Sequence, residues 1–313
     1  MYTGNTPIQK LKSLSGNELF IKREDLIPYS FGGNKARKAA LFFEELDRGG
    51  YDCVVTYGSG RSNHCRVVAN MAAERGIPCH VISPEEASEE TNNSVMVRLF
   101  GAEITTVPVS EVHDTIERVL SGLRAEGKRP YFIPGGGHGN IGTRAYIDCW
   151  EEIRSYEQSE GIYFDYLFTA SGTGTTQAGL ICGKLLHGDG TEIIGISIAR
   201  ENPRGRNVVL DGVREYLSAA GRSFSEEEIE KATVFLDDYV GSGYGKNDPA
   251  ILATIADVMR WEGIPLDSTY TGKAYYGMCC YLDERKITGK NVLFLHTGGT
   301  PLFFDDLKEL DQI

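Results

Sequence analysis

The sequence predicts an α/β protein with two blocks, each an open, mostly parallel, twisted sheet flanked by helices. The chain has 313 residues, of which 41% are hydrophobic and 24% charged, a size and composition typical of about two soluble domains. Short apolar runs alternate along it with segments of helical periodicity. Many of its 37 glycines cluster directly after the apolar runs, as in loops at the carboxyl ends of parallel strands.

Seven short apolar segments predict the strands of these sheets: residues 52–56, 79–83, 103–107, 130–133, 166–170, 193–198 and 292–296. Eight further segments predict helices: residues 36–48, 63–75, 92–100, 112–125, 143–156, 175–186, 248–262 and 271–283. In the second of these helices, Val67, Val68 and Met71 share one apolar face, as an amphipathic helix requires. The two blocks of strands and helices span roughly residues 40–142 and residue 143 onward.

Charge and cysteine content disfavour several classes of protein. Lys and Arg number 32 against 44 Asp and Glu, a net charge of −12, which disfavours binding to nucleic-acid phosphates. No apolar stretch approaches the ~20 residues that a membrane-spanning helix needs. Lys10, Lys12 and Glu18 interrupt the start of the chain, so no secretory signal is expected. The seven cysteines form no CxxC pair, which predicts reduced thiols in the cytoplasm.

The clearest single motif is a run of glycines and threonines at residues 171–176, between a predicted strand and a predicted helix. Glycines there let backbone N–H groups approach an anion, and the helix N-terminus adds about half a positive charge. The run lacks the Gly-Lys-Ser/Thr of a P-loop and the glycine spacing of a dinucleotide fingerprint. It predicts a phosphate at a helix start, and the alternative is a tight turn between strand and helix.

Lys35 and Lys38 follow the Gly32-Gly33 turn three residues apart, and so lie on one face of a predicted helix. A lysine at a helix start is badly placed with respect to the helix dipole, which lowers its pKa. A lowered pKa suits an amine that must act as an unprotonated nucleophile toward a carbonyl group. The alternative for an isolated lysine is an ordinary surface residue of that helix.

A third polar cluster, Ser62-Asn63-His64, follows the first predicted strand and begins the helix after it. Ser62 has the position of an N-cap. Asn63 and His64 add side-chain donors at a strand end, where ligands of open α/β sheets bind. No Asp, Glu or Cys stands at ligand spacing from His64 or from His296 near the C-terminus, so no metal site is expected. The absence of a G-x-S-x-G motif disfavours a serine hydrolase.

Together these motifs resemble the D-cysteine desulfhydrase/1-aminocyclopropane-1-carboxylate deaminase family. The start of the family pattern is similar to residues 22–25 (Lys-Arg-Glu-Asp) followed by residues 31–38 (Phe-Gly-Gly-Asn-Lys-Ala-Arg-Lys). Its later motifs match, in order, residues 62–64, 171–176, 241–245 (Gly-Ser-Gly-Tyr-Gly), 270–274 (Tyr-Thr-Gly-Lys-Ala) and 296–299 (His-Thr-Gly-Gly). The resemblance covers about residues 6–303, nearly the whole chain.

This resemblance implies a pyridoxal-phosphate enzyme of the tryptophan synthase β fold type, also called fold type II. It implies a large cofactor-binding domain of residues 1–39 and 143–313 and a small domain of residues 40–142. The active site is expected in the cleft between them. The expected partners are a small amino-acid substrate and a second copy of the chain in a homodimer, with no nucleic acid and no membrane.

The resemblance also assigns residues to the cofactor, pyridoxal 5'-phosphate. Lys35 would hold it covalently and move the Cα proton of the substrate. Asn63 would donate a hydrogen bond to its phenolic oxygen, and Lys38 would bind its phosphate together with the glycine-threonine loop. The further cofactor contacts that the resemblance implies are Gly172, Thr173, Gly174, Thr175, Thr176, Thr271, Thr297 and Gly298.

For the substrate, the resemblance implies that Ser62, Asn63 and His64 receive the carboxylate. Tyr244 and Tyr270 would face the substrate and the cofactor ring, on which an aromatic side chain can stack. Together with the cofactor lysine and Ser62, these two tyrosines form the predicted catalytic set.

Two positions bear on which amino acid is the substrate. Family members that open a cyclopropane ring have Glu after the stacking tyrosine, where this chain has Thr271. A hydroxyl beside the ring nitrogen keeps the pyridine neutral, which favours β-elimination of a good leaving group. Family members commonly have Gln before Ser-Asn, where this chain has Arg61. Arg61 would bind a second anionic group such as a sulfonate, or it would point outward and pair with a surface acid.

We therefore expect a pyridoxal-phosphate lyase that performs α,β-elimination on a small β-substituted amino acid. The specific expectation is D-cysteine, giving pyruvate, ammonia and hydrogen sulfide. Alternatives on the same scaffold are an L-cysteate sulfo-lyase, a 1-aminocyclopropane-1-carboxylate deaminase and a β-replacement synthase. An alternative of another class is a non-catalytic protein that binds a phosphate ligand.

Overall fold

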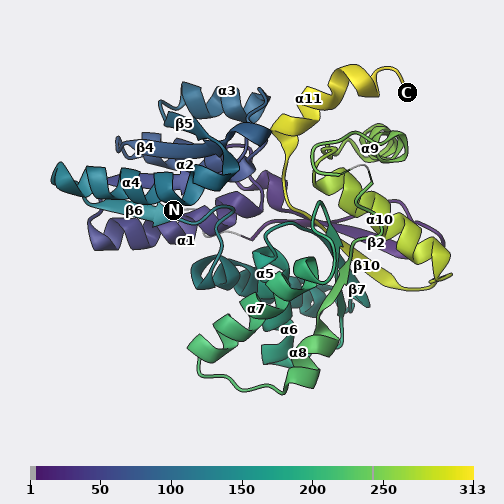
Figure 1. The fold of residues 1–313 in the computed structure, drawn as a ribbon. Helices are drawn as coiled ribbons and strands as arrows, with labels where there is room; N and C mark the ends of the chain where they lie inside the picture. The colour runs from purple at the N-terminus through teal and green to yellow at the C-terminus, as the bar shows by residue number, and fades with distance from the viewer. Residues whose placement is uncertain (1–4, 242) are drawn as a thin grey trace.

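The computed structural model describes residues 5–241 and 243–313, and it contains two sheets covered by helices (Figure 1). The larger sheet has the strand order β1-β2-β10-β7-β8-β9, and the smaller has the order β5-β4-β3-β6. Neighbouring strands pair in parallel in both sheets, except that β1 is antiparallel to β2. The prediction of an α/β protein with two mostly parallel sheets flanked by helices is confirmed.

The larger sheet takes strands from both ends of the chain: β1 (Ile8–Lys10), β2 (Glu18–Arg23), β7 (Tyr166–Ser171), β8 (Glu192–Ser197), β9 (Val234–Leu236) and β10 (Asn291–His296). The smaller sheet is formed by one continuous part of the chain: β3 (Cys53–Tyr57), β4 (Cys79–Pro84), β5 (Glu103–Val107) and β6 (Pro130–Ile133). All seven predicted strands are present, and β1, β2 and β9 are additions that the sequence analysis missed. We call the two sheets with their helices the large lobe and the small lobe.

Helices α1 (Asn34–Gly49), α2 (Asn63–Glu74), α3 (Asn92–Leu99) and α4 (Val112–Ala125) accompany the smaller sheet. The later helices are α5 (Asn140–Glu160), α6 (Thr175–His187), α7 (Arg204–Ala219), α8 (Glu226–Ala232), α9 (Pro249–Glu262), α10 (Thr271–Glu284) and α11 (Thr300–Leu310). The short 3-10 helices are η1 (Glu24–Leu26), η2 (Glu85–Ala87) and η3 (Val109–Glu111). All eight predicted helices are present, whereas α7, α8 and α11 were not predicted.

Two helices connect the lobes. Helix α1 packs against α2 of the small lobe and α5 of the large lobe, and α11 returns from the last strand to pack against α3 and α9 (Figure 1). The predicted boundary between residues 39 and 40 falls inside α1, which runs without a break. The division of the chain into two domains at that boundary stays a prediction.

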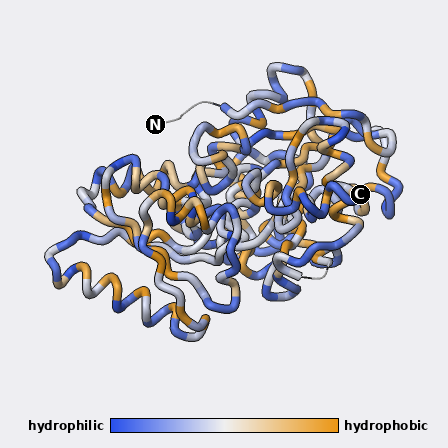
Figure 2. Tube along the Cα trace, turned by 90° about the horizontal axis from the view of Figure 1, so that it is seen from above, coloured by the Kyte–Doolittle hydropathy of each residue, from blue (hydrophilic) through white to orange (hydrophobic). Residues whose placement is uncertain are grey.

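The cores lie between each sheet and its helices. Strands β7 and β10 are buried from their second residue to their last, because helices cover both faces of the larger sheet. Peripheral helices bury a single face; in α4, Ile116, Leu120 and Leu123 are buried while the residues between them are mostly exposed. Figure 2 shows this pattern as hydrophobic and hydrophilic colours that alternate along the outer helices.

The ends of several elements converge between the lobes. Strands β3, β7 and β10 end there, and α1, α2, α6 and α10 each begin there with a residue of their first turn or their N-cap on the wall of a common cavity. Such a meeting of strand carboxyl ends and helix N-termini is where open α/β sheets bind their ligands.

Candidate active site

A cavity of about 670 Å³ lies at this meeting point. Most of the predicted site residues line it: Lys35, Ser62, Asn63, His64, Gly172, Thr173, Gly174, Thr176, Tyr244, Tyr270, Thr297 and Gly298. The predicted site residues that are not on its wall are Lys38, Arg61, Thr175 and Thr271. The fold thus brings together segments of both lobes that lie far apart in the sequence.

The charged side chains on the cavity wall are positive, whereas the chain as a whole carries a net negative charge. In the part of the chain that the structure describes, its charged lining side chains are Lys35 and Arg200, and no Asp or Glu lines it. The N-termini of α1, α2 and α6 add partial positive charge at the same wall. Because the protein carries a net charge of −12, this is a local reversal of sign. The cavity therefore favours an anionic ligand.

Lys35 lies in the first turn of α1, and its Nζ donates a hydrogen bond to the Gly136 carbonyl at 3.1 Å. The helix begins at Gly33, whose φ of 93° is left-handed and whose Cα approaches the Thr297 carbonyl so closely that a Cβ would lie 2.6 Å from its oxygen. Burial lowers the pKa of the Lys35 amine to about 8. The lowered pKa agrees with the prediction, and a fraction of the amine is unprotonated at neutral pH.

Lys38, one turn further along α1, is fully buried, and its Nζ has no hydrogen-bond partner in the described chain. The amine lies 5.7 Å from the centre of the Tyr146 ring. Burial and the neighbouring Lys35 lower its pKa well below the usual range. A buried donor without an acceptor is costly unless a ligand supplies one. Lys38 therefore has the environment of a residue that binds an anion, as predicted, although it lies behind the cavity wall.

The glycine-threonine loop joins β7 to α6, with Gly174 in a left-handed conformation at the N-cap. Its first backbone N–H groups have no acceptor within the helix, which makes the loop an anion cradle. Three side chains that the sequence analysis missed hold it in place. Asn34 Nδ2 donates to Thr176 Oγ1 at 3.0 Å, His138 Nδ1 bonds to Thr175 Oγ1 at 2.9 Å, and Arg200 donates to the Gly172 carbonyl.

The Ser62 hydroxyl caps α2 by accepting from the Cys65 N–H at 3.1 Å, which is the structural role that its position predicts. Asn63 Oδ1 accepts hydrogen bonds from Asn93 Nδ2 at 3.0 Å and from Arg66 at 3.3 Å. These bonds fix the amide of Asn63 so that its Nδ2 donors face away from both partners. The geometry suits the predicted donation from Asn63 to a ligand oxygen in the cavity.

The hydrogen bonds of Thr56 fix the tautomer of the His64 ring. Its Nε2 lies 2.8 Å from Thr56 Oγ1, and that hydroxyl also bonds to the Ile133 carbonyl at 2.8 Å. Because a carbonyl cannot donate, the single hydroxyl proton of Thr56 goes to Ile133, and His64 Nε2 must donate to Thr56. Nδ1 is then an unprotonated atom, buried and without a partner among the described residues. An acceptor does not bind a carboxylate, so the structure gives the predicted carboxylate contact no support from this ring.

Two tyrosines complete the wall opposite Lys35. The hydroxyls of Tyr244 and Tyr270 lie 2.7 Å apart, and Tyr244 also lies 3.2 Å from the Ser59 hydroxyl of the small lobe. Burial raises the pKa of both phenols, so both stay protonated at neutral pH. The three hydroxyls form a chain across the cavity from one lobe to the other.

Thr271 is the first residue of α10, but it does not contact the cavity. Its hydroxyl donates to Asp267 Oδ2 at 2.8 Å and accepts from the Asp267 N–H at 2.9 Å. The Asp267 carboxylate also accepts from the N–H groups of Thr269, Tyr270 and Thr271, which stabilises the start of the helix. The Thr271 hydroxyl thus orients Asp267, whose carboxylate binds the first N–H groups of α10, and the predicted contact of Thr271 with the cofactor ring has no support from this geometry.

Arg61 likewise is not on the cavity wall. Its Nε donates to Glu89 Oε1 at 2.6 Å in an ion pair. This is the outward alternative of the sequence analysis, in which Arg61 pairs with a surface acid. The predicted contact of Arg61 with the substrate has no support from this geometry.

Comparisons with known proteins show the family of this chain. A family model described as "Pyridoxal-phosphate dependent enzyme" matches residues 1–298. The chain belongs to this family. It is 36% identical to the D-cysteine desulfhydrase of Yersinia enterocolitica over 96% of this chain and 92% of that one, and 33% identical to that of Serratia proteamaculans over the same shares. A solved structure titled "Crystal Structure Analysis of the ACC deaminase homologue" superposes with a TM-score of 0.88 at 30% identity, covering 99% of this chain and 94% of that one.

The residues in and behind this cavity fit the cofactor of a pyridoxal-phosphate enzyme. The buried amine of Lys38, which lacks an acceptor, and the N–H groups of the loop are donors for its phosphate. Asn63 offers free amide donors, and Lys35 offers an amine with a lowered pKa. No carboxylate on the described wall opposes the phosphate charge.

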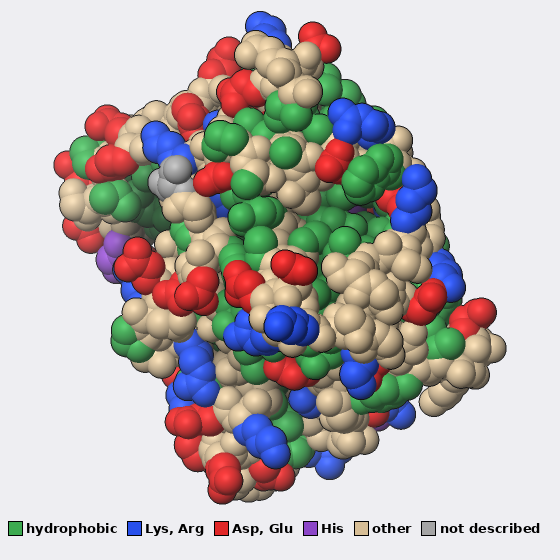
Figure 3. Space-filling view, turned by 90° about the vertical axis from the view of Figure 1, so that its right-hand side faces the viewer, with side chains coloured by type: hydrophobic (Ala, Val, Ile, Leu, Met, Phe, Trp, Pro, Cys, Tyr) green, Lys and Arg blue, Asp and Glu red, His purple; other side chains and the backbone are tan. Residues whose placement is uncertain are grey.

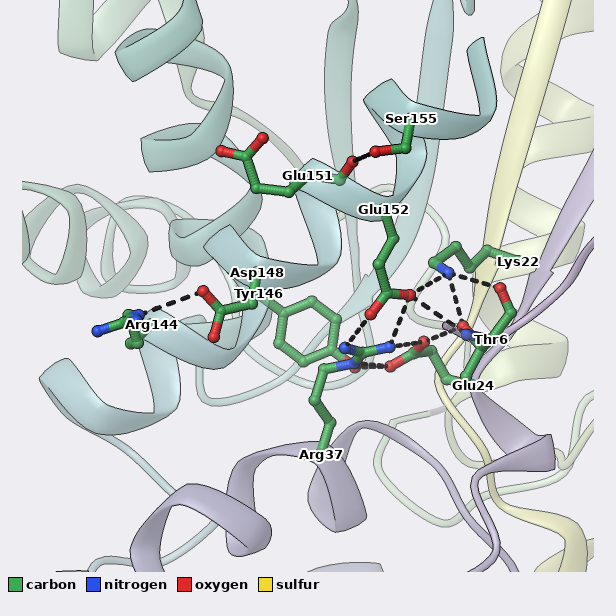
Figure 4. Close-up of polar contacts among 10 residues, drawn as sticks. All are labelled: Thr6, Lys22, Glu24, Arg37, Arg144, Tyr146, Asp148, Glu151, Glu152 and Ser155. Atoms are coloured by element: carbon green, nitrogen blue, oxygen red, sulfur yellow. Dashed lines mark hydrogen bonds and ion pairs between the residues drawn. The ribbon is translucent and has the colours of Figure 1, made fainter. Parts of the chain in front are cut away.

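Between α1 and α5, this pyridoxal-phosphate enzyme has a network of buried charges (Figure 4). Arg37 donates to both oxygens of Glu24 at 2.5 and 2.7 Å and to both oxygens of Glu152 at 2.7 and 3.1 Å. Lys22 donates to Glu152 at 2.6 Å and to the hydroxyl of Thr6 at 2.6 Å. Two acids thus balance two bases. The sequence analysis missed this network, although residues 22–25 were part of the resemblance.

No group of His, Cys, Asp and Glu in the described chain could hold a metal ion. No helix among the described residues is long and apolar enough to span a membrane.

Proposed function

We propose that this pyridoxal-phosphate enzyme catalyses α,β-elimination on D-cysteine. D-cysteine and one water give pyruvate, ammonia and hydrogen sulfide. The observation that carries this proposal is the amine of Lys35, which lies on a cavity wall free of carboxylates with its pKa lowered to about 8. The identity of 33–36% with D-cysteine desulfhydrases over 96% of the chain supports the choice of substrate.

Different residues of the chain have different roles in the proposed reaction. Pyridoxal phosphate, when bound, supplies the electron sink that weakens the bonds at the substrate Cα. Lys35 would act as the base toward that carbon, a role that suits an amine partly unprotonated at neutral pH. The Gly172–Thr176 loop and Lys38 hold the phosphate. Tyr244, a neutral phenol whose hydroxyl is bonded to Tyr270, is a proton donor for the departing sulfur.

The position of Arg61 supports an uncharged β-substituent. Its guanidinium is paired with Glu89, and the other cation near the cavity rim, Arg200, donates to the Gly172 carbonyl beside the phosphate loop. A sulfonate on the substrate would therefore find no free cation beside the Ser62 motif. This favours a thiol over cysteate.

Deamination of the cyclopropane amino acid is a second candidate, because a structure titled as an ACC deaminase homologue superposes on nearly the whole chain. Position 271 does not decide between the two activities, since the Thr271 hydroxyl both donates a hydrogen bond to Asp267 and accepts one from it.

The test is a product assay on the purified, cofactor-loaded protein. D- and L-cysteine, L-cysteate and 1-aminocyclopropane-1-carboxylate are supplied in turn, and sulfide, sulfite, pyruvate and 2-oxobutyrate are measured. Equal amounts of sulfide and pyruvate from D-cysteine would support the proposal. Release of 2-oxobutyrate without sulfide, or of sulfite from cysteate alone, would contradict it.

The same proposal includes a homodimer in the cytoplasm. On the face shown in Figure 3, apolar side chains gather near the centre among charged ones. Large apolar side chains that are exposed in the described chain include Met259 and Trp261 of α9 and Phe304 and Leu307 of α11. All seven cysteines are free thiols, which suits a reducing compartment. Light scattering on the purified protein would give twice the mass of one chain, and a monomer would contradict the dimer.

A further inference from the structure

Arg61 lies on a short loop of the small lobe that is held rigidly in place. The Gly60 N–H donates to the Ala87 carbonyl at 2.7 Å, and the Thr91 hydroxyl donates to the Gly60 carbonyl at 2.6 Å. Asn93 Nδ2 donates to the Arg61 carbonyl at 3.0 Å. The backbone of this loop is therefore fixed before the side chain of Arg61 makes any contact.

From this fixed base, the guanidinium of Arg61 reaches to the large lobe. It lies 3.5 Å from the hydroxyl of Thr269, next to Tyr270 in the chain. Gly245 lies close to this side chain, since a Cβ at Gly245 would lie 3.0 Å from Arg61 Nε and 3.2 Å from its Cδ. Glu89 Oε1, which is bonded to Arg61 Nε at 2.6 Å, lies near Gly245 as well, 3.5 Å from such a Cβ.

The segment that Arg61 touches carries Tyr244. Gly243 and Gly245 flank this tyrosine with left-handed φ values of 111° and 65°, so the backbone on both sides of it has little intrinsic stiffness. The segment depends on contacts from outside: Lys273 of α10 donates to the Gly243 carbonyl, and Arg61 packs on Gly245. Tyr244 is therefore supported on both sides by a buried or half-buried cation.

The charges around Arg61 show that it is not a free cation. Burial disfavours its charged form, but the carboxylates of Glu89, Asp306 and Asp305 outweigh burial and raise the pKa of Arg61. Arg61 stays charged, and its charge is already compensated by protein acids. A second anion would compete with them.

We propose that Arg61 is a positioning residue for Tyr244. Glu89 orients its guanidinium, and the guanidinium in turn holds Gly245 and Thr269, so that the Tyr244 hydroxyl stays between Ser59 and Tyr270. The inference deepens the proposed function, because it rests on the placement of Tyr244 beside the substrate. It also gives a structural role to a position at which this chain departs from the glutamine common in the family.

The variants Arg61→Gln and Glu89→Gln test this role, with Arg98→Gln as matched control. Arg98 forms a comparable pair with the neighbouring Glu90 at 2.7 Å, within the small lobe. The first readout needs no substrate. Lys246 is exposed directly after the segment, and the rate of limited tryptic cleavage there, followed by mass spectrometry, reports how often the segment opens.

Cleavage after Lys246 should become about two- to fivefold faster in both Arg61→Gln and Glu89→Gln, the size expected for a partly exposed ion pair. The double variant should match the single ones, because the two residues act as one unit. Arg98→Gln should cleave at the wild-type rate. Unchanged cleavage in Arg61→Gln would overturn the proposal, whatever the substrate proves to be.

The second readout is the kinetics with D-cysteine. The two possible roles of Arg61 predict different changes in kcat and KM for Glu89→Gln. If Arg61 positions Tyr244, Glu89→Gln lowers kcat by the same factor as Arg61→Gln, with little change in KM. If Arg61 binds the substrate, Glu89→Gln frees the guanidinium, so KM falls while Arg61→Gln raises it, and the proposal is wrong. Absence of any sulfide would contradict the proposed function, while the cleavage experiment would still decide the role of Arg61.

Discussion

Helix α1 carries two kinds of buried charge within one turn. Arg37 belongs to the network between α1 and α5, where each of its acidic partners is bonded through both oxygens. Lys35 and Lys38 have between them, among the described residues, one acceptor, the Gly136 carbonyl that binds Lys35. Both regions are buried, but only one is complete without a ligand. The difference teaches that satisfied charges hold the scaffold, whereas unsatisfied ones mark the place for a bound group.

The largest effect is expected at the cavity. Replacing Lys35 by Ala removes the amine that would join the cofactor, so we expect complete loss of the visible absorbance of the lysine-bound cofactor and of turnover. The Arg37 network should be untouched, because it lies on the opposite face of α1. An absorbance spectrum of the dialysed variant checks this, and a wild-type spectrum would refute the role of Lys35.

A substitution in the Arg37 network should instead lower the free energy of unfolding. Arg37→Met leaves Glu24, which is fully buried, without its main partner, and removing one member of a buried ion pair typically costs about 3–5 kcal/mol. Chemical denaturation of the cofactor-free chain measures this loss. Arg48→Met, an exposed position further along the same helix, should change the free energy of unfolding by less than about 0.5 kcal/mol. Equal effects of the two variants would show that the network does not support the fold.

Lys38→Met should separate stability from binding. The change removes an amine that is fully buried without an acceptor, so the cofactor-free chain should gain about 1 kcal/mol in its free energy of unfolding. The affinity for pyridoxal phosphate should fall about 10- to 100-fold, because a charged hydrogen bond to the phosphate is lost. Affinity for pyridoxal, which lacks the phosphate, should change little. A variant that loses stability and keeps its phosphate affinity would contradict the role of Lys38 as an unpaired donor for the phosphate.

The remaining effects concern pH, and they should appear at opposite ends of the scale. Burial opposes the ionisation of Glu24, but Arg37 and Lys22 outweigh it and lower the pKa from 4.5 to about 2. The stability that Glu24 contributes is present above about pH 4.5 and is lost as the pH falls toward 2.

The pKa of Lys35 is lowered from 10.5 to about 8, so between these values the unfolded chain holds more protons than the folded one. The cofactor-free chain should therefore become more stable as the pH rises from 8 toward 10.5. Unfolding curves across the pH range, with Arg37→Met and Lys35→Met as references, check both windows. Identical pH profiles for these two variants would contradict the assignment.

The periodic parts of the fold could be predicted from the sequence, and the missed elements have identifiable reasons. In strand β2 (Glu18–Arg23), Lys22 interrupts the apolar pattern. Its amine can be buried because the Glu152 carboxylate balances its charge and the Thr6 hydroxyl accepts a hydrogen bond from it. Strands β1 and β9 are three residues long, too short for a pattern to be recognised. Helix α7 was overlooked although Val209, Val213 and Leu217 give it an apolar face.

The candidate site likewise contains features that the sequence predicted and features that it did not. Glycine-rich turns were found, because glycine marks backbone conformations that other residues avoid. The contacts by which Asn34, His138 and Arg200 support the loop were missed, since nothing local shows which distant loop a side chain will bond to, even for Asn34 and His138, which stand next to glycines. For Arg200 the position after a predicted strand was the one available signal.

The order of strands and helices and the glycine-rich turns were determined by the sequence, because hydrophobic periodicity and glycine position act over a few residues. The roles of Lys35 and of the loop of residues 171–176 toward the cofactor stay predictions from the family resemblance. The tertiary structure decided which polar side chains are free. Arg61 is committed to Glu89, Thr271 to Asp267 and the His64 Nε2 proton to Thr56. A hydrogen bond or ion pair depends on separations of about 3 Å, and only the folded chain sets such separations between distant segments.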